Sequence, residues 1–187
     1  AEKRRMAEEA ARLKREKLRR FGSNAQATLQ ELVTASGYNY DYVFTDQLLS
    51  GEVAKKCRVL LLPAVVALSA DEIRALRGFV EGGGLLIADL QTGAWDELGR
   101  ANPLRGEVES LFGIVQNPAV FALEPLQVPL PDGQGEVEGH GVSGTKAAGG
   151  KALASVNGQD VCILNRLGKG STLYLNFVPK KGEWLVP

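Results

Sequence analysis

The sequence contains very few of the residues that build metal sites, disulfide scaffolds or nucleophile–histidine pairs. Its 187 residues include two cysteines, Cys57 and Cys162, and a single histidine, His140. No HxxxH, HExxH or CxxC pattern occurs, so we predict no metal site and no cofactor. Both cysteines fall in or beside predicted strands, where we expect small core residues. The sequence alone leaves a disulfide between them open.

Long apolar runs and an excess charge of one sign are also absent. No run approaches the ~20 residues that a membrane helix needs, and 22 Lys and Arg balance 22 Asp and Glu. We therefore expect no membrane partner and no nucleic-acid partner. Hydrophobic residues make up 44% and charged residues 24%, which excludes global disorder. The charged opening residues form no signal peptide, so a cytoplasmic location is favoured while the compartment stays undetermined.

The balanced net charge conceals a basic segment at the start of the chain. Residues 1–20 contain nine Lys or Arg and four Glu, a net charge of +5, and the remainder, with 13 basic and 18 acidic residues, carries −5. Residues 1–21 lack Gly and Pro and are rich in good helix formers, so we predict a charged helical extension or linker. A basic arm for nucleic acid or an anionic membrane remains an alternative, without aromatic anchors in residues 1–20 to support it.

The clearest structural pattern is a strand–helix–strand unit. Residues 59–62 form an apolar run that ends at Pro63, which is typical of a strand buried on both faces. Ser69 and Glu72 have the spacing of a capping box that begins a helix, and three consecutive glycines follow the helix. Residues 85–90 are a second predicted strand. This order predicts a right-handed parallel crossover between the two strands.

The flanking segments give weaker patterns. We predict a helix that ends at Gly37, a short strand over residues 42–44, and mostly loop or edge strand over residues 117–150, where Pro and Gly are frequent. Apolar and polar residues alternate over residues 172–177. We therefore expect this last strand to bury the face that carries its leucines and phenylalanine.

Two features that point to catalysis or nucleotide binding lack a supporting context. A Ser–His or Cys–His pair would have to use His140, which lies in a glycine-rich stretch predicted to be a loop. A degenerate hydrolase that uses His140 stays open as one alternative function. Residues 139–144 match G-x-G-x-x-G, but the pattern predicts neither a strand before them nor a helix after them. We therefore do not predict dinucleotide binding.

The candidate ligand-binding residues are Asp89, Thr92, Trp95 and Asp96, which lie at or just beyond the end of the strand 85–90. Ligands of open α/β sheets bind beyond the carboxyl ends of the strands, and an exposed Trp ring can stack on a sugar. A carbohydrate- or small-molecule-binding module with its pocket here is the second hypothesis. The alternative for each residue is structural: Asp89 caps a turn or pairs with Arg, Asp96 is solvated, and Trp95 packs on its own domain.

An ordered set of short segments resembles a known family, the beta-galactosidase trimerisation domain. This domain follows the catalytic barrel in glycoside hydrolase family 42 and related bacterial proteins. The resemblance extends over about residues 22–178 and depends on the whole set, since no single segment is specific. The segments are 40–48, 58–63, 68–72, 79–84, 88–93, 96–97, 111–114 and 165–170.

The resemblance implies an α/β fold, a flavodoxin-like or class I glutamine amidotransferase-like three-layer sandwich with a mainly parallel sheet. It implies a domain over residues 22–178 between the charged helix and a C-terminal tail of residues 179–187. The related amidotransferases carry a nucleophilic cysteine directly after the strand that corresponds to residues 85–90, and this sequence has none there. The charged segment stands where the family fold has its first strand.

From the resemblance we expect no catalytic residue in this chain. We expect an accessory domain of a larger glycoside hydrolase-like protein, used in oligomerisation or domain packing. Its partners are then other domains of the parent chain and further copies of itself, a trimer by resemblance.

Overall fold

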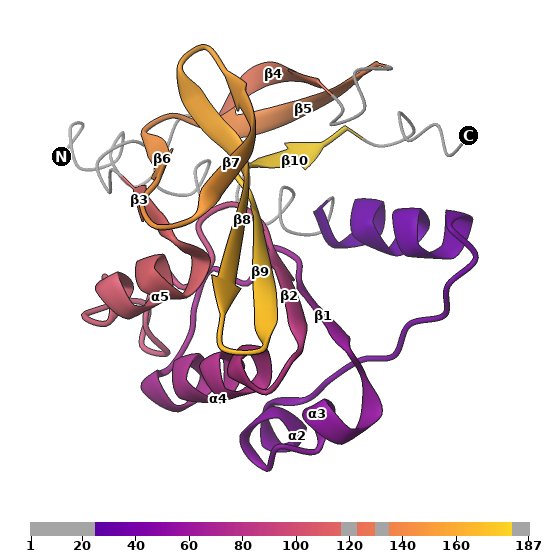
Figure 1. The fold of residues 1–187 in the computed structure, drawn as a ribbon, viewed down its shortest axis with the longest axis vertical. Coiled ribbons are helices and arrows are strands. Elements are labelled where there is room, and N and C mark those ends of the chain that lie inside the picture. Colours follow the sequence, from indigo (N-terminus) through magenta and orange to yellow (C-terminus); the bar gives the residue numbers. More distant parts are fainter. Residues whose placement is uncertain (1–24, 117–122, 130–134, 181–187) are drawn as a thin grey trace, which may run out of the picture.

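A five-stranded mixed sheet forms the centre of the molecule (Figure 1). The computed structural model describes residues 25–116, 123–129 and 135–180. The predicted charged helix and most of the predicted tail lie outside them, and the predicted domain boundaries stay a prediction. The strands of this sheet, in spatial order, are β1 (Val59–Leu62), β2 (Leu85–Ala88), β9 (Gly170–Leu175), β8 (Gln159–Leu167) and β7 (Lys151–Val156).

The predicted strand–helix–strand unit is confirmed. Strands β1 and β2 are parallel, and α4 (Ala70–Glu81) connects them. Helix α4 begins at Ser69, whose Oγ accepts a hydrogen bond from the Glu72 backbone N–H, while the Ser69 N–H donates to Glu72 Oε2 at 2.9 Å. These reciprocal bonds satisfy two donors that the first turn of a helix leaves unpaired.

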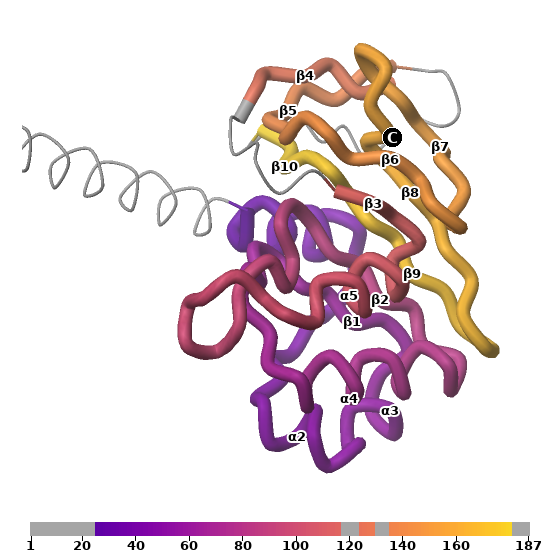
Figure 2. Tube along the Cα trace, turned by 90° about the vertical axis from the view of Figure 1, so that its left-hand side faces the viewer, coloured from indigo at the N-terminus to yellow at the C-terminus, as the bar shows by residue number. Residues whose placement is uncertain are grey.

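Helices α4 and α5 (Arg105–Phe112) bury one face of the sheet (Figure 2). Their apolar side chains, including Ile73, Leu76 and Leu111, form the main core together with Leu60 and Leu86 of the sheet. The other helices are α2 (Thr45–Leu49), α3 (Val53–Lys56) and the helical residues 25–35. The chain turns at Gly37, which has a φ of 77°, as the sequence predicts.

Two smaller antiparallel sheets complete the fold. One has the order β10 (Phe177–Pro179), β5 (Glu136–Val142) and β4 (Leu123–Pro129), and the other pairs β3 (Ile114–Gln116) with β6 (Thr145–Ala147). Most of the described part of 117–150, predicted to be mostly loop or edge strand, is strand, and β4 does lie at the edge of its sheet. Glycines contribute to the pairing, because a Cβ at Gly139 would lie 2.7 Å from the Val178 carbonyl oxygen.

The predicted flavodoxin-like, amidotransferase-like sandwich with a mainly parallel sheet was wrong. Strands β1, β2 and β9 are parallel, but β8 and β7 are antiparallel to their neighbours, and both smaller sheets are antiparallel. The cause is local: β8 and β9 are joined by a tight turn in which Gly168 has a φ of 59°. A parallel pair would need a crossover of a dozen or more residues instead.

The predicted strand over residues 42–44 was also wrong. Residues 38–44 run from the first helix to α2 without joining any strand of the described chain (Figure 1). Their side chains are exposed, with 57% of Tyr42 and 67% of Phe44 accessible to solvent.

Candidate functional site

Asp89 is a buried carboxyl group at the end of β2. Its side chain is 3% exposed, and both carboxyl oxygens accept a hydrogen bond from the Ala64 N–H, at 2.8 and 2.9 Å. Burial raises the pKa of Asp89 from 3.8 to about 7, against the opposing effect of the Ala64 hydrogen bond. Ala64 itself has a φ of 53°, in the left-handed region that an alanine rarely adopts. The backbone is therefore held in an unfavourable conformation at a donor that Asp89 uses.

Tyr174 lies at the same edge of the sheet, near the end of β9. Its hydroxyl oxygen accepts hydrogen bonds from the Gln91 backbone N–H, at 3.2 Å, and from the Gln116 side-chain amide. Burial raises the pKa of this phenol, the negative charge of Asp89 adds to the increase, and Arg105 opposes it. Gln91 has a φ of 62°, so two strained residues flank this polar cluster.

Within β9 the buried face is the reverse of the predicted one, whereas Phe177, which begins β10, is buried as predicted. Thr172, Tyr174 and Asn176 are 0–1% exposed, whereas Leu173 and Leu175 are only partly buried. The buried hydroxyl and amide groups find acceptors in the chain: Thr172 Oγ1 donates to the Leu111 carbonyl at 3.1 Å, and Asn176 Nδ2 donates to the Val142 carbonyl at 2.7 Å. A buried polar group with a partner costs little, and the leucines are left on the opposite face.

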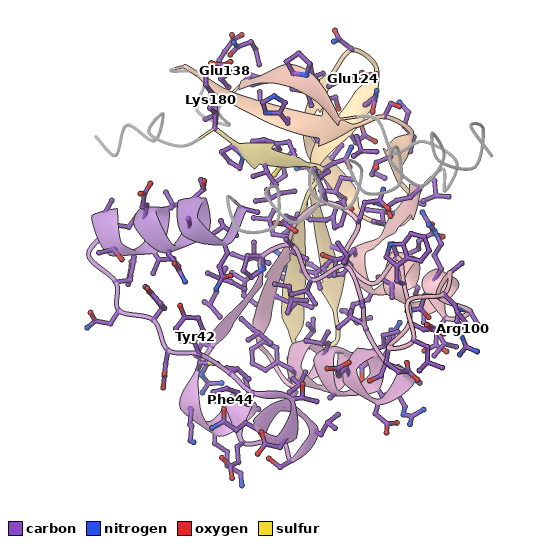
Figure 3. The ribbon with its side chains drawn as sticks, turned by 180° about the vertical axis from the view of Figure 1, so that it is seen from behind. Tyr42, Phe44, Arg100, Glu124, Glu138 and Lys180 are labelled. Atoms are coloured by element: carbon purple, nitrogen blue, oxygen red, sulfur yellow. The ribbon has the colours of Figure 1, made fainter. Side chains whose placement is uncertain are left out.

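The side chains of Thr92 and Asp96 form hydrogen bonds within the chain. Thr92 Oγ1 donates to the Asp89 carbonyl at 2.9 Å, and this threonine is 3% exposed. Asp96 accepts hydrogen bonds from the Leu98 N–H, the Arg100 N–H and Arg100 Nε, at 2.8–3.0 Å. The Arg100 backbone hydrogen bond is the main cause that lowers the pKa of Asp96. Asp96, which the structural alternative placed in solvent, is therefore the anchor of a tight loop at residues 96–100; Figure 3 labels Arg100 on it.

Trp95 is the predicted site residue that offers an accessible surface. Its side chain is 41% exposed, while its backbone forms bridges to Ala67 and Ala101. Asn102, which the sequence analysis missed, holds this loop in place, because its buried side-chain amide donates to the carbonyls of Leu68, Gly93 and Trp95. The structure thus brings Asp89 and Thr92 together and places Trp95 and Asp96 on the following loop. A ligand site at these four residues stays a prediction.

The remaining candidates for chemistry are dispersed. His140 lies in β5 rather than in a loop, is exposed, and has Pro125 and Val178 as cross-strand neighbours, neither of which is a nucleophile. Cys57 and Cys162 are free thiols, and burial raises the pKa of both. Among the described residues no group of three or more His, Cys, Asp or Glu is arranged to hold a metal.

A large apolar groove lies on the sheet face opposite α4 and α5. The space has a volume of about 1310 Å³ and continues round the edge of β1, where Leu48, Val53 and Leu76 line it. On the open face its walls are the helical residues 25–35 and residues 38–44. Its floor is a row of side chains that stand half-exposed on the central strands, in contrast to their fully buried neighbours along each strand. We call this surface the apolar groove; its floor consists of Val59, Leu61, Leu85, Ile87, Leu173, Leu175 and Cys162.

Hydrogen bonds attach the outer wall of the groove, residues 38–44, to neighbouring elements. The Tyr42 hydroxyl, labelled in Figure 3, accepts a hydrogen bond from Gln30 Nε2 of the first helix at 2.6 Å. The ring of Tyr42 also packs edge-on against Tyr40, at a centroid distance of 5.9 Å. At the lower end of the wall Thr45 Oγ1 donates to Glu72 Oε1 of α4 at 3.1 Å. The wall is therefore tied to elements on both sides.

Comparison with solved structures shows where this fold occurs. The fold is similar to part of the beta-galactosidase from Bacillus circulans sp. alkalophilus, with a TM-score of 0.60 and 19% identity over 67% of this chain and 21% of that one. The exo-beta-1,4-mannosidase from Opitutaceae bacterium strain TAV5 gives a TM-score of 0.63 and 20% identity over 83% of this chain and 26% of that one. This chain therefore spans about a fifth to a quarter of these glycoside hydrolases.

A third similar structure is a ThuA-like protein from Bacteroides uniformis, with a TM-score of 0.56 and 17% identity over 90% of this chain and 79% of that one. No family model matches the sequence, and no curated protein matches it. At these identities the similarity shows a shared fold. Helices long and apolar enough to cross a membrane are absent from the described residues.

Replacement of Asp89 with Asn tests the buried carboxyl. A pKa near 7 in the folded chain, against 3.8 in the unfolded chain, means that the folded state keeps a proton that the unfolded state releases. The stability contributed by the protonated group is complete below about pH 4 and is lost as the pH rises through 7. The full loss corresponds to roughly 4 kcal/mol.

An asparagine side chain at this position would keep an oxygen for the Ala64 N–H without a charge. We therefore expect Asp89→Asn to raise the free energy of unfolding by about 4 kcal/mol at pH 8 and by less than half of that at pH 5. Urea unfolding at both pH values measures this difference. An effect of equal size at pH 5 and pH 8 would contradict the account of Asp89.

Proposed function

We propose that this chain is a non-catalytic accessory domain of a larger glycoside hydrolase-like protein, and that it packs against another part of that protein through the apolar groove. The apolar groove carries the proposal. A parallel sheet is normally covered on both faces, and here α4 and α5 cover one face of β1, β2 and β9, while no helix of the described residues covers the other face. Large exposed apolar patches on a folded protein mark interaction sites.

The side chains at the candidate site support a non-catalytic role. Asp89 and Thr92 are each 3% exposed, and among the described residues their side chains form hydrogen bonds with the protein's own backbone. The Asp96 carboxylate accepts a hydrogen bond from Arg100 Nε. General acid–base catalysis needs a group within hydrogen-bond reach of its substrate, and these carboxyl groups are occupied in holding the loops at this edge of the sheet.

The similar structures support an accessory role within a longer protein, because the matched part is about a fifth of each beta-galactosidase. The proposal includes further copies of the same protein as partners, in a trimer as the sequence resemblance implies. It also includes a cytoplasmic location, which suits two free thiols since such compartments keep thiols reduced.

Photo-crosslinking of the native gene product in its source cells tests the packing proposal. The photoreactive residue p-benzoylphenylalanine replaces either Val59, on the groove floor, or Val115, on β3; both valines are 48% exposed strand residues. We expect position 59 to crosslink to another segment of the same gene product or to a glycoside hydrolase, identified by mass spectrometry. Position 115 is the matched control, and equal crosslinking at both positions, or none at 59, would refute the proposal.

Sugar binding at Trp95 is the second candidate function, and the 41% exposure of this ring on a fixed loop favours it. If it holds, galactose, mannose or their short oligosaccharides should quench or shift the Trp95 fluorescence in a saturable way. Trp95→Phe, which leaves the other tryptophan in place, should remove the change. A titration up to about 100 mM sugar without any saturable change would rule out this candidate.

A further inference from the structure

We infer that the apolar groove accepts an extended β-strand from another polypeptide segment, which pairs with the free edge of β1 and lies against residues 39–43. The inference rests on the proposed function, since it states how the packing partner is recognised. Two rows of backbone groups that have no partner among the described residues carry it, together with one apolar floor.

The first row is the outer edge of β1. This strand lies at the end of the sheet and pairs with β2 alone among the described residues. Alternate residues of a strand direct their N–H and C=O groups to opposite sides, so β1 offers unpaired groups along its outer edge. Its residues, Val-Leu-Leu-Leu, are typical of an interior strand, whereas natural edge strands are protected by charges, prolines or bulges. The sequence of β1 is thus that of a strand with a neighbour on each side.

The second row is the backbone of residues 39–43 on the facing wall. In the described chain the N–H groups of Asn39, Tyr40, Asp41 and Val43 donate no hydrogen bond. The Tyr42 N–H reaches only the neighbouring Asp41 side chain, at 2.8 Å. The next residue, Phe44, is in an extended conformation with φ −92° and ψ 156°. Residues 39–43 line the same groove as β1, which places two backbone edges around one apolar space.

The chemistry of the groove favours a strand over a helix. A helix satisfies its own backbone hydrogen bonds and would leave both rows unpaired, whereas an extended segment supplies donors and acceptors along its length. Successive side chains of a strand point to opposite faces. One face of the inserted segment would therefore lie beside Val59 and Leu61 on the groove side, and the other beside Leu60 and Leu62 on the side that α4 covers. The four residues of β1 correspond to a partner segment of about five to seven residues.

A synthetic strand tests the inference on the full chain. The probe is a fluorescein-labelled peptide, Lys-Thr-Val-Thr-Val-Thr-Val-Thr-Lys, capped at both ends; the control peptide has the same side chains with N-methyl groups on its three valines. Methylation removes the hydrogen-bond donors of one edge. We expect saturable binding of the probe by fluorescence anisotropy, at least tenfold weaker binding of the methylated peptide, and slower amide hydrogen exchange in β1 and residues 39–43 when the probe is bound.

Two matched substitutions locate the binding. Val59→Glu places a charge on the groove floor and should weaken probe binding at least tenfold, while Val115→Glu, at an equally exposed strand position outside the groove, should leave it unchanged. Far-ultraviolet circular dichroism checks that both variants fold. The inference is overturned if the probe does not bind at millimolar concentration, if both peptides bind equally, or if Val115→Glu weakens binding as much as Val59→Glu. Crosslinking from position 59 together with any of these results would leave the proposed function standing and remove strand pairing as its mode.

Discussion

Helices bury one face of the central sheet, and no helix of the described chain covers the other. The rest of the structure follows from this difference. Helices α4 and α5 bury one face, and they do so over Thr172 and Tyr174 of β9 because each of these polar side chains has a hydrogen-bond partner there. Alternation along the strand then places Leu173 and Leu175 on the opposite face. That face carries the apolar side chains of β1 and β2 as well, and no helix in the described chain lies across it. The apolar groove is therefore a consequence of how β9 is oriented.

The part of the fold that the sequence predicts correctly is the part specified by neighbouring residues. Ser69, Glu72 and the three glycines after α4 define the ends of one helix without any distant contact. The β-rich second half depends on pairing between residues far apart, such as Glu124 with Gly141, and its prolines and glycines look like loop residues in a sequence. The orientation of β9 is likewise undetermined by alternation alone, since hydrogen-bond partners from α5 and from the loop after β2 decide it.

The candidate site divides in the same way. Its position after β2 follows from the strand pattern, and Asp89 does lie at that edge. The burial of Asp89, the left-handed backbone at Ala64 and Gln91, and the contribution of Tyr174 and Asn102 depend on loops that meet only in the folded chain. Conformational strain and a buried acid at one edge of a sheet cost stability. The strained backbone and the buried acid both lie where the loops join the sheet, close to the apolar groove.

The most direct test of the account is amide hydrogen exchange of β1 in two samples, the native gene product purified intact from its source cells and this chain alone. If the apolar groove is a packing surface for another polypeptide segment, the outward-facing amides of β1 and those of residues 39–43 should exchange at least tenfold more slowly in the intact protein. The amides of α4, which are buried in both samples, serve as the internal reference. Equal exchange of β1 in the two samples would contradict the account.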